Sequence, residues 1–100
     1  MMAFERIMGI EVIDDVQYQQ YREAMTPLLH AVGGDFGYDF KIAEVLKSKT
    51  DAKINRVFTI DFPSEEVMND FFGSESYLAV KKQYFDRSVA SKTVISLAEK

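Results

Sequence analysis

The chain has 100 residues, 47% of them hydrophobic, and its 12 basic and 16 acidic side chains give a net charge of −4. This length fits one domain with one core, and the interspersed charge argues against a nucleic-acid-binding surface, which needs a basic face. Cysteine is absent, which excludes disulfides, thiolate catalysis and cysteine-bound metals. We therefore expect a single domain over residues 1–100 that binds no nucleic acid.

The start of the chain does not read as a targeting segment. Glu5 and Arg6 interrupt its apolar run, and no small-residue cleavage pattern follows. No apolar stretch approaches the roughly 20 residues that a membrane-spanning helix needs. We expect a cytoplasmic protein that is not embedded in a membrane.

Residues 4–13 alternate as a strand, which is predicted to turn Phe4, Met8, Ile10 and Val12 to one side. Asp14 follows as a helix N-cap, and Gln17 completes a capping box. The apolar stripe of the predicted helix consists of Tyr18, Tyr21, Met25, Leu28, Leu29 and Val32.

Pro27 lies inside this helical pattern and leaves two alternatives open. The helix kinks there, or Thr26 caps a second short piece with Pro27 in its first turn. Gly33 and Gly34 are predicted to end the helix.

The second half of the chain predicts a hairpin, two short helices and a last strand. Residues 36–46 and 54–62 are rich in aromatic and β-branched side chains and flank a polar loop. Ser64 and Ser74 are expected to cap the two helices, and Gly73 to separate them. Residues 93–98 form the last predicted strand. The order β-α-β-β-α-β is typical of the ferredoxin-like α+β fold, a four-stranded antiparallel sheet with its first and third strands central and its helices on one face.

Short motifs occur in the order typical of a known family. They are V-I-D-D-x-x-Y-x-x-Y at residues 12–21, G-G at 33–34, E-V-L at 44–46, F-P-S at 62–64 and S-x-x-Y at 74–77. With these motifs the chain resembles the family called domain of unknown function 1330, within the dimeric α/β-barrel superfamily. The resemblance implies a ferredoxin-like fold and a homodimer in which two sheets pair. Superfamily relatives include cofactor-independent monooxygenases, isomerases and haem-degrading enzymes, whose pockets lie between sheet and helices.

The apolar alternation of the hairpin predicts its register. The pairs Leu46–Ile54, Ile42–Phe58, Phe40–Ile60 and Tyr38–Phe62 place these side chains under the helices, and the same register sets Glu44 opposite Arg56 on that face. The favoured interpretation is a structural ion pair. The alternative is the polar part of a pocket with Tyr38 and Arg6, which aromatic side chains such as Phe72 and Tyr77 would cover.

The opposite face of the sheet has no predicted helix over it and carries Ile7, Ala43, Val45 and Val57. An exposed apolar patch of this kind favours a homodimer. The register also sets Asp39 opposite Asp61 on this outer face, as a pair of like charges.

Composition limits the chemistry that the chain offers. His30 is the one histidine, and its helical position turns it toward solvent, away from the apolar stripe. One histidine and no cysteine are too few for a catalytic triad or a conventional zinc site, so we expect neither a metal nor another cofactor. Two functions stay open: binding, with or without turnover, of a small mostly apolar molecule, and a non-enzymatic homodimeric interaction module.

Overall fold

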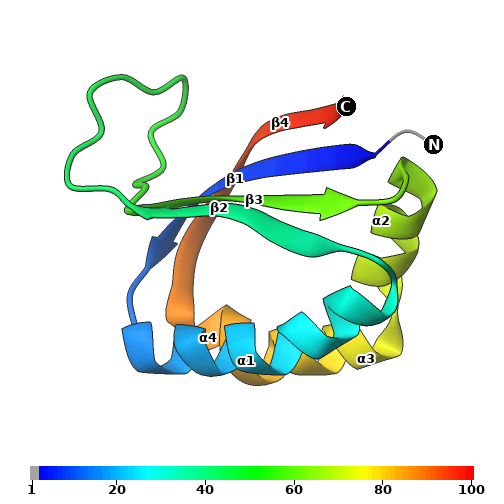
Figure 1. Cartoon of the computed structure of the whole chain (residues 1–100). Coiled ribbons are helices and arrows are strands. Elements are labelled where there is room, and N and C mark those ends of the chain that lie inside the picture. The colour runs from blue at the N-terminus through cyan, green and yellow to red at the C-terminus, as the bar shows by residue number, and fades with distance from the viewer. Residues whose placement is uncertain (1–2) are drawn as a thin grey trace.

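The computed structural model describes residues 3–100 as an antiparallel sheet covered on one face by helices (Figure 1). The strands are β1 (Phe4–Val12), β2 (Asp35–Lys41), β3 (Arg56–Phe62) and β4 (Val89–Glu99). They lie in the order β2-β3-β1-β4, and every neighbouring pair is antiparallel. The predicted ferredoxin-like topology, with the first and third strands at the centre, is confirmed.

Helix α1 (Asp15–Ala31) runs beneath the sheet beside a chain of shorter helical segments (Figure 1). These are α2 (Glu65–Gly73), α3 (Glu75–Val80), the π-helix η1 (Lys81–Phe85) and α4 (Asp86–Ser88). The three predicted caps are confirmed, because the side chains of Asp14, Ser64 and Ser74 each accept a hydrogen bond from a backbone N–H three residues later.

Pro27 lies inside α1, which continues through it to Ala31. The alternative of a second, separately capped helix is wrong. The hydroxyl of Thr26 donates a 2.6 Å hydrogen bond back to the carbonyl of Arg22, so it does not cap a new helix. Gly33, at φ +80°, ends the helix as expected, in a conformation that suits glycine.

The core fills the space between the sheet and the helices. The predicted inward side of β1 is confirmed. Of the predicted apolar stripe of α1, four residues are buried, whereas Leu28 is half-buried and Val32, just past the end of the helix, is exposed. The buried hydrophobic residues are Phe4, Met8, Ile10, Val12, Tyr18, Tyr21, Met25, Leu29, Phe58, Ile60, Phe62, Met68, Phe71 and Tyr77.

The predicted hairpin register is wrong. Phe36 pairs with Ile60, and Phe40 pairs with Val57. The two residue numbers of each predicted pair add up to 100, whereas those of the observed pairs add up to 96 and 97. A β-bulge between Phe36 and Asp39, where β2 holds one residue more than β3, accounts for the step from 96 to 97. The offset from 100 to 96 is already present at Asp35 and Phe36, before the bulge.

The bulge reverses which side chains of β2 face the helices. Tyr38 and Phe40 turn to the outer face, where they are 64% and 53% exposed and stack on each other. Asp39 turns inward, so its predicted pairing with Asp61 on the outer face is also wrong, and Asp35 takes the place opposite Asp61. A one-residue shift exchanges the two faces because side chains alternate along a strand.

The strands of the hairpin are shorter than predicted, and β4 is longer. β2 ends at Lys41 and β3 begins at Arg56, so residues 42–55 form a loop that projects on the side of the sheet away from the helices (Figure 1). Ile54 in this loop lies over Gly9 of β1. A Cβ atom added to Gly9 would lie 2.9 Å from the Ile54 side chain.

Gly34 is expected to tolerate no side chain. A Cβ atom there would lie 2.6 Å from the Leu29 side chain and 2.9 Å from the backbone carbonyl of Asp61, which has no freedom to move aside. Gly34→Ala should therefore lower the free energy of unfolding by about 1–3 kcal/mol, as overpacking does. Gly73→Ala is the matched control, because nothing lies within 4 Å of its Cβ position. Urea unfolding of both variants measures the difference, and equal stabilities would contradict the predicted clash.

Candidate functional site

A cavity of about 130 Å³ lies between the sheet and the helices. An engineered apolar cavity of about 150 Å³ holds a benzene molecule, so this volume suits a ligand of about that size. The walls come from every layer of the fold: β1, β2, β3 and β4 on one side, and α1, α2, α3 and η1 on the other. The lining residues are Arg6, Met8, Ile10, Tyr21, Met25, Phe36, Phe58, Ile60, Phe72, Tyr77, Leu78, Lys81, Phe85 and Lys92.

Arg6 brings a positive charge into this mostly apolar cavity. It lies on the inward side of β1, with its guanidinium carbon 4.7 Å from the centre of the Phe72 ring. Its Nε donates to the sulfur of Met8 at 3.2 Å, which is a weak acceptor. Burial lowers the pKa of Arg6 from its usual value, although a guanidinium keeps its charge in proteins.

Two tyrosine hydroxyls meet beside Arg6. The oxygens of Tyr21 and Tyr77 are 2.8 Å apart, and both side chains are buried. Burial raises the pKa of each phenol, so both are neutral at physiological pH. Whichever hydroxyl donates within the pair, the other keeps its own hydrogen free for a further hydrogen bond.

The π-helix η1 shapes the wall opposite the sheet. Two of its five residues, Lys81 and Phe85, line the cavity, and the ring of Phe85 packs 4.9 Å from that of Tyr21. Such single π-turns are rare and frequently occur at functional sites.

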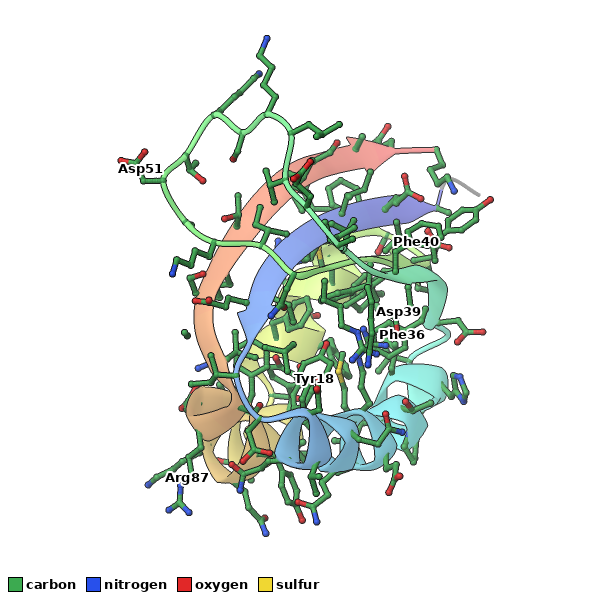
Figure 2. All side chains as sticks on the ribbon, turned by 90° about the vertical axis from the view of Figure 1, so that its left-hand side faces the viewer. Tyr18, Phe36, Asp39, Phe40, Asp51 and Arg87 are labelled. Carbon is green, nitrogen blue, oxygen red and sulfur yellow. The ribbon has the colours of Figure 1, made fainter. Side chains whose placement is uncertain are left out.

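A second group of charges lies on the same face of the sheet, between β2 and α1. Arg56 donates to both carboxylate oxygens of Asp39, at 2.9 and 2.7 Å, and Arg22 approaches the same carboxylate at 3.3 Å. Figure 2 shows Asp39 and Phe36 on the side of β2 that faces α1, and Phe40 on the other side. The Arg22 guanidinium stacks 3.9 Å from the Phe36 ring.

Asp39 is held ionised by these partners. Burial alone would raise its pKa, but the hydrogen bonds from Arg56 and the charges of Arg22 and Arg56 outweigh this and lower the pKa below its usual value. The group therefore acts as an ion-pair clamp between β2, β3 and α1, in which one carboxylate binds two guanidinium groups.

The structure brings together three of the six residues predicted to bind a ligand. Arg6, Phe72 and Tyr77 line the cavity, where their binding role stays a prediction. Arg56 lies on the expected face, but it pairs with Asp39 and not with Glu44, so the predicted ion pair is wrong.

The positions predicted for Tyr38 and Glu44 are also wrong. Tyr38 lies on the outer face because of the bulge. Glu44 is exposed in the loop, where it lines a larger hollow of about 850 Å³ on that outer face.

The cavity also contains polar groups that the sequence interpretation missed. The helical spacing of Tyr21 predicts a core residue and gives no sign of a polar role, and no pattern in the sequence singles out Lys81 or Lys92. The burial of Arg22, which belongs to the neighbouring clamp, could have been predicted from its spacing in the sequence. Arg22 follows Tyr18 by four residues and precedes Met25 by three, which places it on the buried side of α1.

His30 turns to solvent as predicted, with a side chain that is 54% exposed and lies 3.0 Å from Asp35. Within residues 3–100, no three His, Cys, Asp or Glu side chains are grouped so that they could hold a metal ion. None of the helices in this range is long and apolar enough to cross a bilayer.

Comparison with known proteins gives a family and a fold. Residues 6–99 match the family model described as "Domain of unknown function (DUF1330)". No curated protein matches the chain. The structure is similar to that of the methylated RPA0582 protein, whose unmethylated form is described as a protein of unknown function from Rhodopseudomonas palustris. The TM-score is 0.79 and the identity 14%, over 98% of this chain and 80% of the other.

Two further similar structures belong to proteins that are described by their assembly or by an activity. One is a "dimeric ferredoxin-like protein of unknown function" from Thermobifida fusca, with a TM-score of 0.59 and 13% identity over 99% of this chain and 90% of the other. The second is a putative monooxygenase from Lactobacillus acidophilus, with a TM-score of 0.62 and 15% identity over 97% of this chain and 44% of the other. At these identities the similarity extends to the fold alone.

Asp39→Asn is expected to lower the free energy of unfolding by about 1–3 kcal/mol, because it removes the charge that compensates two largely buried guanidinium groups. Above about pH 5 the variant should show the full decrease in the free energy of unfolding relative to the wild type. This decrease should shrink as the pH falls through the lowered pKa of Asp39 in the folded protein, where the wild-type carboxylate becomes neutral as well.

Glu44→Gln is the control for this variant, because Glu44 is exposed in the loop. It should change the stability by no more than about 0.5 kcal/mol. Urea unfolding between pH 3 and pH 8 measures both variants. A larger decrease in stability for Glu44→Gln than for Asp39→Asn would contradict the observed register and support the predicted pairing of Glu44 with Arg56.

Proposed function

We propose that this chain, which belongs to the DUF1330 family, binds a small, mostly apolar molecule between its sheet and helices. The family description names no reaction, so the proposal is based on the cavity. The observation that carries the proposal is the cavity wall, in which apolar and aromatic side chains surround one guanidinium and one hydroxyl pair. Ligand sites have this composition, with a few converging polar groups that orient the ligand in an apolar pocket.

Turnover of the bound molecule is an extension of this proposal. It has the support of one fold relative, the chain described as a putative monooxygenase. Because fold similarity does not carry function, binding is the part that the cavity supports directly.

The second part of the proposal is assembly, in which the outer face of the sheet pairs with a second copy of the chain. Tyr38, Phe40 and Ile95 are each at least half exposed, and Leu46 of the loop is 88% exposed. Beside them, the hollow of about 850 Å³ under residues 42–55 is lined largely by apolar side chains. A protein of the same fold is described as dimeric. A surface of this kind marks an interaction site more often than a free surface.

The alternative function, a non-enzymatic interaction module, rests on the same outer face. If that face is the whole functional unit, the cavity is only a packing defect of the core. The two interpretations differ in one measurable property, because only the first requires small molecules to enter the cavity and stabilise the fold.

A neutral apolar probe tests cavity binding. Benzyl alcohol should raise the midpoint of thermal unfolding of the wild type, since a ligand at about 100 times its Kd stabilises the native state by about 2.7 kcal/mol. Leu78→Trp should abolish this shift, because residue 78 lines the cavity and is partly exposed, so an indole there blocks the site without removing core contacts. Ala79→Trp, at the exposed neighbouring position outside the cavity wall, is the control and should retain the shift. Absence of a shift in the wild type with any small aromatic probe would favour the interaction module.

Light scattering coupled to size exclusion tests the assembly. The wild type should elute with about twice the chain mass of 11.5 kDa. Phe40→Lys should shift the mass toward that of the monomer, because it places a charge beside Tyr38 among the exposed aromatic side chains of the outer face. Gln20→Lys adds the same charge on the exposed side of α1 and should remain dimeric. A monomeric wild type at micromolar concentration would rule out the proposed dimer.

A further inference from the structure

We propose that the ligand of this cavity is a small carboxylate, whose charged group is bound by Arg6 and by the free hydroxyl hydrogen of the Tyr21–Tyr77 pair, with its apolar part among the phenylalanine rings. This inference rests on the proposed function, because it specifies the molecule that the cavity binds.

The charges that line the cavity all have one sign. Its charged residues are Arg6, Lys81 and Lys92, and its wall contains no aspartate or glutamate. Lys81 is paired with Asp86 at 2.8 Å, outside the wall. An apolar space with uncompensated positive charge favours an anion and disfavours a cation, since charges interact more strongly there than in water.

Arg6 differs from the other two arginines that project from the sheet and helices into the interior. Arg22 and Arg56 share the carboxylate of Asp39, which pairs with both and balances one of their two positive charges. Within residues 3–100, Arg6 has no carboxylate within 4.0 Å, and its contacts are the face of Phe72 and the sulfur of Met8. Arg6 is half-buried, and partial burial of a charge without a partner is costly, so an anionic ligand at this guanidinium would offset that cost. Guanidinium groups bind carboxylates through two parallel hydrogen bonds.

The tyrosine pair supplies the second contact. Both phenols are neutral and share one hydrogen bond, so one O–H remains available as a donor. Tyr77 lies close enough to Arg6 for the arginine charge to lower its pKa in part, against the larger effect of burial. A donor and a cation side by side complement a carboxylate, which only accepts hydrogen bonds.

The volume and the wall limit the rest of the ligand. About 130 Å³ has room for one aromatic ring or a short branched chain, and not for a fatty acid or a nucleotide. Phe36, Phe58 and Phe85 line the cavity, and such rings pack favourably against another ring. The chemical class is therefore a monocarboxylate with the dimensions of benzoate.

Three probes of the same size but different charge test the inference at pH 7: benzoate, benzyl alcohol and benzylamine. Binding is measured by titration calorimetry and by chemical-shift changes of the cavity residues. Benzoate should bind the wild type roughly 10- to 100-fold more tightly than benzyl alcohol, as a hydrogen-bonded charge does, and benzylamine should bind most weakly.

Arg6→Met should remove the preference for benzoate and retain the binding of benzyl alcohol, because methionine preserves the length and apolar part of the side chain. Arg6→Lys keeps the charge without the two-pronged geometry and should retain part of the preference. Arg87→Met is the control for loss of a positive charge, since Arg87 is exposed and lies outside the cavity wall, and it should leave the order of affinities unchanged.

The outcomes separate the two levels of the proposal. If benzyl alcohol binds in the cavity and benzoate binds no more tightly, cavity binding stands and the carboxylate inference is wrong. If Arg6→Met folds and still prefers benzoate, the inference is wrong as well. If none of the three probes binds the wild type, the proposed function fails and the inference fails with it.

Discussion

The β-bulge at Gly37 and Tyr38 determines which chemistry lies on each face of the sheet. A Cβ atom on Gly37 would lie 2.5 Å from the hydroxyl of Thr59, and the N–H of Tyr38 donates to that hydroxyl at 2.8 Å. The absence of a side chain at residue 37 therefore lets the extra residue fit against β3. Beyond the bulge, Asp39 faces the helices and Phe40 faces outward. Without it, the carboxylate that compensates two arginines would lie on the outer face, and the aromatic residues that we assign to assembly would lie inside.

The helix-facing side of the sheet contains two sites with buried or half-buried arginines, and they differ in how the charge is balanced. At the edge near β2, Asp39 lies between Arg22 and Arg56, and the rings of Tyr18 and Phe36 pack on the guanidinium groups. Under the centre of the sheet, Arg6 contacts the Phe72 ring and the Met8 sulfur, and among residues 3–100 no carboxylate pairs with it. The first arrangement pairs both arginines with a carboxylate of the chain and is suited to stability, although among residues 3–100 one buried terminal nitrogen of Arg22 has no hydrogen-bond partner. The second becomes complete with an anion, which is why we assign binding to the cavity and a structural role to the clamp.

The two proposed roles, ligand binding and assembly, fall on opposite faces of the sheet. The cavity lies on the helix side and draws its walls from a single chain, whereas the exposed aromatic residues and the hollow beneath residues 42–55 lie on the other side. β1 and β3, at the centre of the sheet, contribute to both faces.

The sequence by itself determined the elements, their order and the family. Caps such as Asp14 and Ser64, the glycines that end helices and the apolar stripe of α1 are local signals, since each depends on residues a few positions apart. They were sufficient for the ferredoxin-like topology and for the inward side of β1, which includes Arg6.

Only the tertiary structure decided the register of the hairpin and the composition of the site. The bulge depends on contact between Gly37 and Thr59, residues 22 positions apart, and alternation of aromatic side chains cannot show where a strand gains an extra residue. The cavity likewise joins β1, α1, α3 and η1, so the meeting of Tyr21 with Tyr77 across 56 positions depends on how the layers pack. Local patterns specify which side of an element is buried, but the partner of each buried polar group is chosen by packing between elements.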